Sequence, residues 1–88
     1  MISHLTKDFL NYFRKLPLRI QTQARKNYKL WKKDPYQKSL GFKKIDKKNN
    51  IYSIKVGIGW RALGIKEDKT IVWFWIGSHE DYNNLIKN

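Results

Sequence analysis

The chain has 88 residues, 41% of them hydrophobic and 15% aromatic, so we expect a single domain over residues 1–88 with one small core. It contains no cysteine, which excludes disulfide frameworks and thiolate zinc sites and suits the reducing, cytoplasmic compartment. No secretory leader opens the sequence, and no apolar run approaches the roughly 20 residues that span a bilayer, so we expect no membrane partner.

The charge is strongly basic and unevenly distributed. Nineteen Lys and Arg residues against seven Asp and Glu give a net charge of +12. Residues 1–50 hold fourteen basic and three acidic side chains, a net +11, whereas residues 51–88 hold five and four, a net +1. Self-repulsion at this density favours an anionic partner, either a nucleic acid or an acidic protein. A plain solvated surface is the third interpretation.

The first half of the chain predicts two helices. Thr6 is a plausible N-cap for a short helix that ends at Leu16-Pro17, and Pro17 then opens a second helix at its first position. The second helix ends at Asp34-Pro35. Its apolar stripe consists of Ile20, Ala24, Tyr28 and Trp31. Because the link between the helices is short, we expect an αα-hairpin.

The second half predicts an antiparallel β-meander of about four strands, at residues 40–45, 51–56, 60–66 and 70–76. Connections this short require antiparallel neighbours. Residues 2–5 are a weaker candidate for an edge strand. The predicted fold class is therefore α+β, with the helix hairpin packed on one face of the meander and a short C-terminal helix.

Alternation along the last strand separates its apolar side chains into two sets. Val72, Phe74 and Ile76 are expected to point inward, which places Trp73 and Trp75 on the opposite face. Two indoles there would form either a stacking or partner-binding surface or a small second core under the last helix. A one-residue slip in register would exchange the two sets.

Several proton-transfer groups follow the last strand directly. Gly77-Ser78 breaks the strand, and His79, Glu80, Asp81 and Tyr82 come next. Ser78 is a candidate N-cap for the last helix, with both carboxylates in its first turn and with Tyr82 and Leu85 packing back on the sheet. Such a cap does not exclude a functional site at the same place.

The meander also gathers basic side chains from successive strands: Lys43, Lys44, Lys55 and Arg61. With His79 and Tyr82 at one end of the sheet, this set suits metal-free phosphodiester cleavage. Cationic groups stabilise the charge that develops on phosphorus, and His or Tyr transfers protons. RNA is the easier substrate because its 2′-hydroxyl is a built-in nucleophile. The sequence shows neither metal-ligand spacing nor a Gly-rich phosphate loop, so we expect no cofactor.

In their order and spacing, many short motifs resemble the RelE/ParE superfamily of type II toxin-antitoxin toxins, over nearly the whole chain. These motifs are Leu16-Pro17, Gln23-Ala24-Arg25, Tyr28, Asp34-Pro35, Ser39-Leu40, Phe42-Lys43, Tyr52-Ser53-Ile54, Val56-Gly57, Arg61-Ala62-Leu63-Gly64 and Trp73-Phe74-Trp75-Ile76-Gly77-Ser78-His79. The resemblance implies a small basic toxin with the helix-hairpin and meander architecture, held inactive by an acidic or amphipathic antitoxin.

The resemblance also implies roles for individual residues in an mRNA endoribonuclease. Arg61 would contact the scissile phosphate, and His79 would transfer a proton to the leaving 5′-oxygen. Tyr82 would orient the 2′-hydroxyl or stack on a base. The RNA backbone would be held by Lys43 or Lys44 and by Lys55, and Trp75 is the other candidate for stacking.

The superfamily contains two activities, so two further functions stay open. RelE-like members cleave messenger RNA in the ribosomal A site, whereas ParE-like members inhibit DNA gyrase without cutting nucleic acid. This chain lacks the doubled C-terminal basic residues of the most RelE-like enzymes. The alternatives are therefore a gyrase inhibitor and a basic adaptor that binds only its antitoxin.

Overall fold

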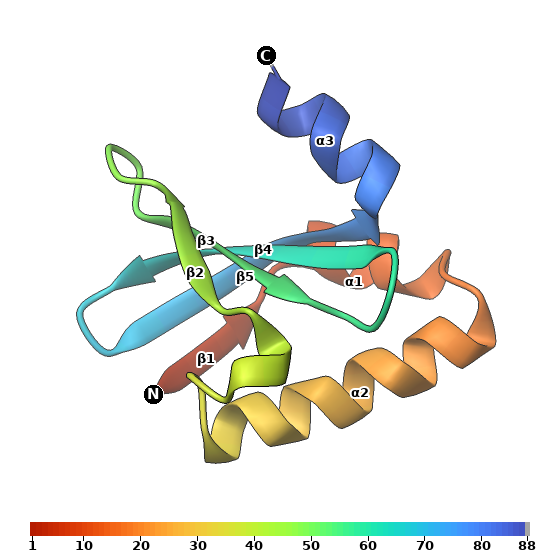
Figure 1. The fold of residues 1–88 in the computed structure, drawn as a ribbon, viewed down its shortest axis with the longest axis horizontal. Helices are drawn as coiled ribbons and strands as arrows, with labels where there is room; N and C mark the ends of the chain where they lie inside the picture. Colours follow the sequence, from red (N-terminus) through yellow and green to blue (C-terminus); the bar gives the residue numbers. More distant parts are fainter. Residues whose placement is uncertain (88) are drawn as a thin grey trace.

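A mixed β-sheet separates two unequal helical layers in the computed structural model, which describes residues 1–87 (Figure 1). Helix α2 runs along one side of the sheet, and α3 projects from the end of β5 on the other side. In chain order the elements are β1 (Ile2–Leu5), α1 (Lys7–Arg14), α2 (Leu18–Lys33), the short 3₁₀ helix η1 (Lys38–Leu40), β2 (Lys43–Asp46), β3 (Ile51–Lys55), β4 (Trp60–Glu67), β5 (Thr70–Ser78) and α3 (His79–Lys87). No helix within residues 1–87 has both the length and the apolar character needed to cross a membrane.

The predicted α+β fold and its meander are confirmed. The order of strands in the sheet is β1-β5-β4-β3-β2, and consecutive strands from β2 to β5 are antiparallel. Residues 2–5 do form the edge strand, β1, but it runs parallel to β5, so the sheet is mixed. A parallel pair needs a long crossover, and here the helices and the rest of the meander supply it.

Both predicted N-terminal helices are present. The Thr6 hydroxyl accepts a hydrogen bond from the Phe9 N–H at 3.0 Å, which confirms the predicted cap of α1. Pro17 precedes α2 as its N-cap residue instead of occupying its first turn. Pro17 lies outside the helix because its backbone is extended, with ψ 146°. Its carbonyl nevertheless accepts the first helical hydrogen bonds, from the N–H groups of Ile20 and Gln21.

The strand predicted at residues 40–45 begins later than expected. Gly41 has φ +55°, a left-handed conformation that glycine adopts without strain, and it closes η1. Strand β2 therefore starts only at Lys43. In the turn that follows, the Asn49 side chain and then its backbone N–H donate to the Asp46 carboxylate. With the Lys48 N–H and charge, these bonds hold the pKa of Asp46 below its ordinary value.

The main core lies between the sheet and the pair α1 and α2. Trp31 is fully buried at its centre, and its ring packs edge-on against Trp73 at 5.3 Å and Phe42 at 5.7 Å between ring centroids. The buried members of this core are Phe9, Leu16, Ile20, Ala24, Trp31, Leu40, Phe42, Ile54, Val56, Ala62, Ile71, Trp73 and Ile76. The predicted stripe of α2 therefore packs on the sheet.

A β-bulge at Phe74 changes which side chains of β5 face the helices. Leu63 pairs with Trp75 while its neighbour Gly64 pairs with Trp73, so Phe74 is an extra residue in the ladder. Trp73 consequently faces α1 and α2, and the prediction that it shares a face with Trp75 is wrong. Because the bulge shifts the alternation midway, Ile76 still points inward and Trp75 outward, as predicted.

The predictions that Val72 and Phe74 point toward the helices are also wrong, again because of the bulge. Phe74 packs against the cluster on the α3 side, and Val72, which pairs with Ile65, lies on the face opposite the buried Ile71. The cluster on the α3 side is a second core of Leu63, Trp75 and Tyr82. Trp75 is only 8% exposed and Trp73 only 3%, so neither indole forms an open surface. The predicted alternative, a small second core under the last helix, is confirmed for Trp75.

Candidate functional site

Two basic side chains meet where β3 and β4 join at one end of the sheet. Lys55 of β3 pairs with Arg61 of β4, and Arg61 pairs with Gly77 of β5. Directly paired residues point to the same face of a sheet. That face is the α3 side, because Leu63, two residues beyond Arg61, belongs to the second core. The register therefore places Lys55 and Arg61 side by side, next to Gly77, which has no side chain.

Arg61 is half-buried, which limits its motion. Its Nη1 donates a hydrogen bond of 2.9 Å to the carbonyl of Trp60. That bond uses one of the five N–H donors of a guanidinium group. An arginine tethered in this way is suited to bidentate contact with a phosphate group.

His79 is placed beside this pair by the junction between β5 and α3. The Ser78 hydroxyl accepts a hydrogen bond from the Asp81 N–H at 3.1 Å, so the predicted cap of the last helix is confirmed. The His79 N–H donates to the Gly59 carbonyl at 2.7 Å. Gly59 has φ +84° in the turn between β3 and β4. The start of α3 is thus tied to the turn between Lys55 and Arg61.

The His79 imidazole is exposed, and a side chain of its own helix lies within hydrogen-bond distance of it. The Asn83 side-chain nitrogen lies 3.2 Å from Nδ1 of His79. Because an amide NH₂ can only donate, this amide orientation makes Nδ1 the acceptor and places the ring proton of a neutral imidazole on Nε2. Sequence reasoning missed Asn83, although its spacing of four residues from His79 on a helix was a usable signal.

Tyr82 and Trp75 lie beneath this site and not on its surface. Tyr82 is 7% exposed, and its ring centroid is 5.9 Å from that of His79. A Cβ added to Gly77 would stand 2.6 Å from the Trp75 indole, so the indole lies directly against the Gly77 backbone. Both rings therefore support the strand that ends at His79, and burial leaves the Trp75 ring no open face for stacking on a base.

The structure separates the two neighbouring lysines of β2. Lys43 pairs with Ser53, on the same face as Lys55 and Arg61. Lys44 points to the other face, where its Nζ lies 5.8 Å from the centroid of the Tyr52 ring. Because Tyr52 packs against the main core, Lys44 is on the helical side of the sheet and does not join the site.

Lys55 is held from behind by α2. The Asn27 side chain donates to the Lys55 carbonyl at 3.1 Å, and the Gln23 side chain donates to Asn27 at 2.8 Å. The aliphatic stem of Lys55 passes close to Gly41. The spacing of Gln23 and Asn27 on a helix is visible in the sequence, but their contact with Lys55 depends on the packing of α2.

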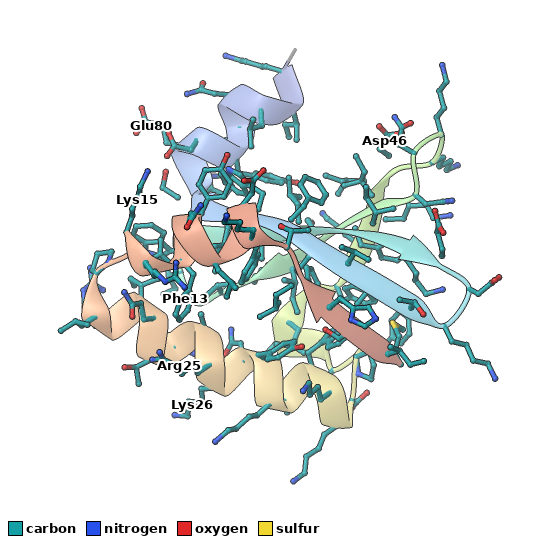
Figure 2. The ribbon with its side chains drawn as sticks, turned by 180° about the vertical axis from the view of Figure 1, so that it is seen from behind. Phe13, Lys15, Arg25, Lys26, Asp46 and Glu80 are labelled. Carbon is teal, nitrogen blue, oxygen red and sulfur yellow. The ribbon has the colours of Figure 1, made fainter. Side chains whose placement is uncertain are left out.

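Carboxylates accompany the basic groups at this end of the sheet. Glu80 and Asp81 occupy the first turn of α3 directly after His79, and Figure 2 shows Glu80 on that helix. Their negative charges interact favourably with the positive end of the α3 dipole, but they repel an approaching anion. Among residues 1–87 the structure shows no group of three His, Cys, Asp or Glu that could hold a metal ion.

One family matches most of the chain by sequence. A sequence model described as the ParE-like toxin domain matches residues 18–84, which include Arg61 and His79. A search of curated proteins found no match.

Solved structures share the fold over almost their whole length. The RelB-RelE antitoxin-toxin complex from Methanococcus jannaschii matches with a TM-score of 0.75 at 18% identity, over 93% of this chain and 96% of that one. The isolated E. coli RelE toxin matches at 0.66 and 20%, over 98% and 95%. The YoeB/ParE toxin from Agrobacterium tumefaciens matches at 0.68 and 12%, over 90% and 99%. At these identities the likeness shows the fold alone.

Proposed function

Because this chain belongs to the ParE-like toxin domain family, within the RelE/ParE superfamily of type II toxin-antitoxin toxins, we propose that it is a metal-free endoribonuclease. Its substrate is messenger RNA on the ribosome, and it acts in the cytoplasm. The observation that carries the proposal is the pairing of Lys55 with Arg61 beside the junction where His79 emerges from β5.

The proposed reaction is an attack by the RNA on its own backbone. The 2′-oxygen bonds to phosphorus as its proton passes to solvent, and the bond from phosphorus to the 5′-oxygen breaks. Arg61 and Lys55 stabilise the extra negative charge on the phosphoryl oxygens. For this step His79 must be an imidazolium, which gives its Nε2 proton to the departing 5′-oxygen and is left as the neutral imidazole. The products are a 2′,3′-cyclic phosphate and a 5′-hydroxyl.

The remaining site residues have supporting roles in this proposal. Lys43 binds a neighbouring phosphate of the RNA backbone on the face of Arg61. Tyr82 and Trp75 act as positioning residues, because both are buried below His79 and Gly77. Lys44 has no direct role, since it lies on the opposite face of the sheet.

Cleavage of mRNA on programmed ribosomes tests the proposal. His79→Ala should reduce the cleavage rate about 10²- to 10⁴-fold, the usual loss when a general acid is removed. Arg61→Ala should reduce it about 10²- to 10³-fold, as for loss of an electrostatic stabiliser. The chain supplies matched controls in His4→Ala and Arg19→Ala, because both residues are exposed and lie on other elements. Equal cleavage by site and control variants would overturn the proposal.

The charge around His79 favours one alternative. Residues 51–88 are almost neutral, and Glu80 and Asp81 follow His79 directly, which weakens attraction for a phosphate backbone. A protein that inhibits DNA gyrase needs no phosphate site there. That alternative predicts stabilised gyrase cleavage complexes with intact transcripts, and both can be measured after a short induction of the chain.

The basic surface supports an acidic or amphipathic antitoxin as the partner. The net charge of +12 favours such a ligand. The Methanococcus jannaschii relative was solved as an antitoxin-toxin complex. A short neighbouring reading frame whose product binds this chain would support the pairing, and a basic product that does not bind would contradict it.

A further inference from the structure

One large apolar side chain stands entirely in solvent at the end of the sheet that carries the candidate site. Ile58 is 100% exposed, compared with 78% for Leu18 and 64% for Tyr36. It is the middle residue of the three-residue turn Gly57–Gly59 between β3 and β4, and Figure 1 shows this turn at the end of the sheet where β5 passes into α3. Turns favour Gly, Pro, Asn, Asp and Ser, so an isoleucine at the tip needs a reason other than turn formation.

The turn holds its tip in a fixed position. Its ends are joined by the hydrogen bond that the Val56 N–H donates to the Trp60 carbonyl at 3.0 Å. Gly57 and Gly59 have left-handed backbone, with φ +70° and +84°, which glycine adopts without strain. The turn also lies against α2, because a Cβ added to Gly57 would stand 3.2 Å from Cγ of Gln23. The tip is therefore supported from both strands and from one helix.

The same turn is tied to the residues of the candidate site. Gly59, which follows Ile58, accepts the hydrogen bond of 2.7 Å from the His79 N–H. Lys55 and Arg61 pair across β3 and β4, and each is three residues from Ile58. Three residues span at most about 11 Å. A phosphate group held by these two cations would therefore lie close to the exposed isoleucine.

An apolar side chain beside paired cations matches the chemistry of an RNA strand. Each nucleotide joins a charged phosphate to a base with a flat apolar face, so one protein surface can contact both. Isoleucine is among the apolar side chains that proteins insert between stacked bases. A protein partner fits less well, because stable interfaces bury about 800 Å² on each side around an apolar centre. Ile58 is instead a single apolar side chain whose neighbours Lys55 and His79 are exposed and polar.

We propose that Ile58 is a wedge that packs against the base next to the scissile phosphate and holds it apart from the neighbouring base. The inference rests on the proposed endoribonuclease function and adds a substrate contact that Arg61 and His79 do not make. Attack on phosphorus requires the 2′-oxygen and the leaving 5′-oxygen to lie in line. Stacking of the two bases that flank the phosphate restricts the backbone from reaching this line. Separation of the bases by Ile58 releases that restriction.

The fluorescence of 2-aminopurine tests the contact directly, because this base analogue is brighter when it is unstacked. It is placed beside the mapped cleavage site of an mRNA on programmed ribosomes, and a 2′-deoxy nucleotide at that site removes the nucleophile and keeps the strand intact. The unmodified chain and Ile58→Leu should raise the fluorescence, whereas Ile58→Ser should leave it at the level of ribosomes alone. Leu18→Ser is the matched control, at an exposed position of α2, and should behave as the unmodified chain does.

Cleavage kinetics provide a second measurement. Ile58→Ser should lower kcat/KM about tenfold, in proportion to the loss of one buried apolar side chain, and Ile58→Leu should retain most of the activity. Because Ile58 is fully exposed in the free chain, neither substitution threatens folding. On an RNA with an abasic nucleotide at the contacted position, the unmodified chain and Ile58→Ser should cleave equally, since no base remains to be held. A merely structural role of Ile58 would preserve the difference.

Three results would overturn the inference. Equal fluorescence or equal cleavage by the unmodified chain and Ile58→Ser, with His79→Ala inactive, would remove the wedge and leave the nuclease proposal standing. A defect of Ile58→Ser that persists on the abasic RNA would assign Ile58 to a contact other than the base. A chain that cleaves no RNA would overturn both proposals, and loss of gyrase inhibition in Ile58→Ser would then make the turn a protein-binding site.

Discussion

At the scale of single residues, two glycines make room for the two indoles of β5. A Cβ on Gly64 would stand 2.8 Å from the Trp73 ring, and a Cβ on Gly77 would stand 2.6 Å from the Trp75 ring. Because of the bulge at Phe74, these rings lie on opposite faces of the sheet. Gly64 therefore makes room for Trp73 in the main core, and Gly77 makes room for Trp75 in the second core. Gly77 is the one that lies beside Arg61, which links the packing of Trp75 to the candidate site.

Gly77→Ala should damage both stability and the site. The added methyl group must displace the Trp75 ring, and overpacking of this kind costs about 1–3 kcal/mol. We expect the urea midpoint to fall and cleavage on programmed ribosomes to fall further than the stability loss explains. Gly64→Ala is the matched control, since it crowds Trp73 on the other face and should lower stability while sparing cleavage. Unchanged stability of Gly77→Ala would contradict the packing described.

At the scale of elements, the three helices of residues 1–87 are attached in different ways. Helices α1 and α2 cover the main core, whereas α3 buries Tyr82 and leaves Leu85 49% exposed. The prediction that Tyr82 and Leu85 pack back on the sheet is thus confirmed for Tyr82, whereas Leu85 is not part of the second core. Helix α3 is held by the Ser78 cap and by the bond from His79 to Gly59. The position of α3 therefore depends strongly on the hydrogen bonds at its N-terminus.

Ser78→Ala should loosen α3 selectively. Loss of an N-cap side chain costs about 0.5–2 kcal/mol, and here the loss falls on the turn that carries His79. We expect faster amide hydrogen exchange in α3 and weaker cleavage. Thr6→Ala removes the equivalent cap of α1 and should lower global stability by a similar amount with little effect on cleavage. If both variants changed cleavage equally, the first turn of α3 would have no special role.

At the scale of the whole molecule, most of the net positive charge lies on a different side from the candidate site of Arg61 and His79. A net +8 is concentrated in residues 7–33, whereas the face with Arg61 and His79 also bears Glu80 and Asp81. The molecule measures 33 × 32 × 26 Å along its principal axes, so charges on one side act on the other at low salt. Self-repulsion among these cations should destabilise the free chain until an anion or a partner relieves it.

Salt should stabilise the free chain. The Debye length falls from about 30 Å at 0.01 M salt to about 10 Å at 0.1 M, which screens repulsion across the molecule. We expect the midpoint of thermal unfolding to rise over this range of NaCl. The double variant Lys29→Gln and Lys33→Gln removes two exposed charges of α2 and should reduce the rise. A midpoint that falls with added NaCl would mean that attractive pairs dominate instead.

Hydrophobic periodicity was sufficient to predict most of the fold. The helical stripe from Ile20 to Trp31 and the short polar turns between strands determine the helices and the order of the meander. The bulge at Phe74 was not predictable, because an extra residue in a ladder leaves the local pattern of apolar residues unchanged. The parallel pairing of β1 with β5 was also beyond reach, since it joins segments far apart in the chain.

The candidate site likewise has some features that the sequence predicts and others that only the tertiary structure decides. The sequence by itself determined the residue types, the strand ends that carry Arg61 and His79, and the Ser78 cap, because these depend on neighbouring residues. Only the tertiary structure decided that Lys43 shares a face with Arg61 while Lys44 does not, and that Trp75 is buried. The physical reason is that the face of a side chain depends on strand register and bulges, and its burial depends on what packs above it.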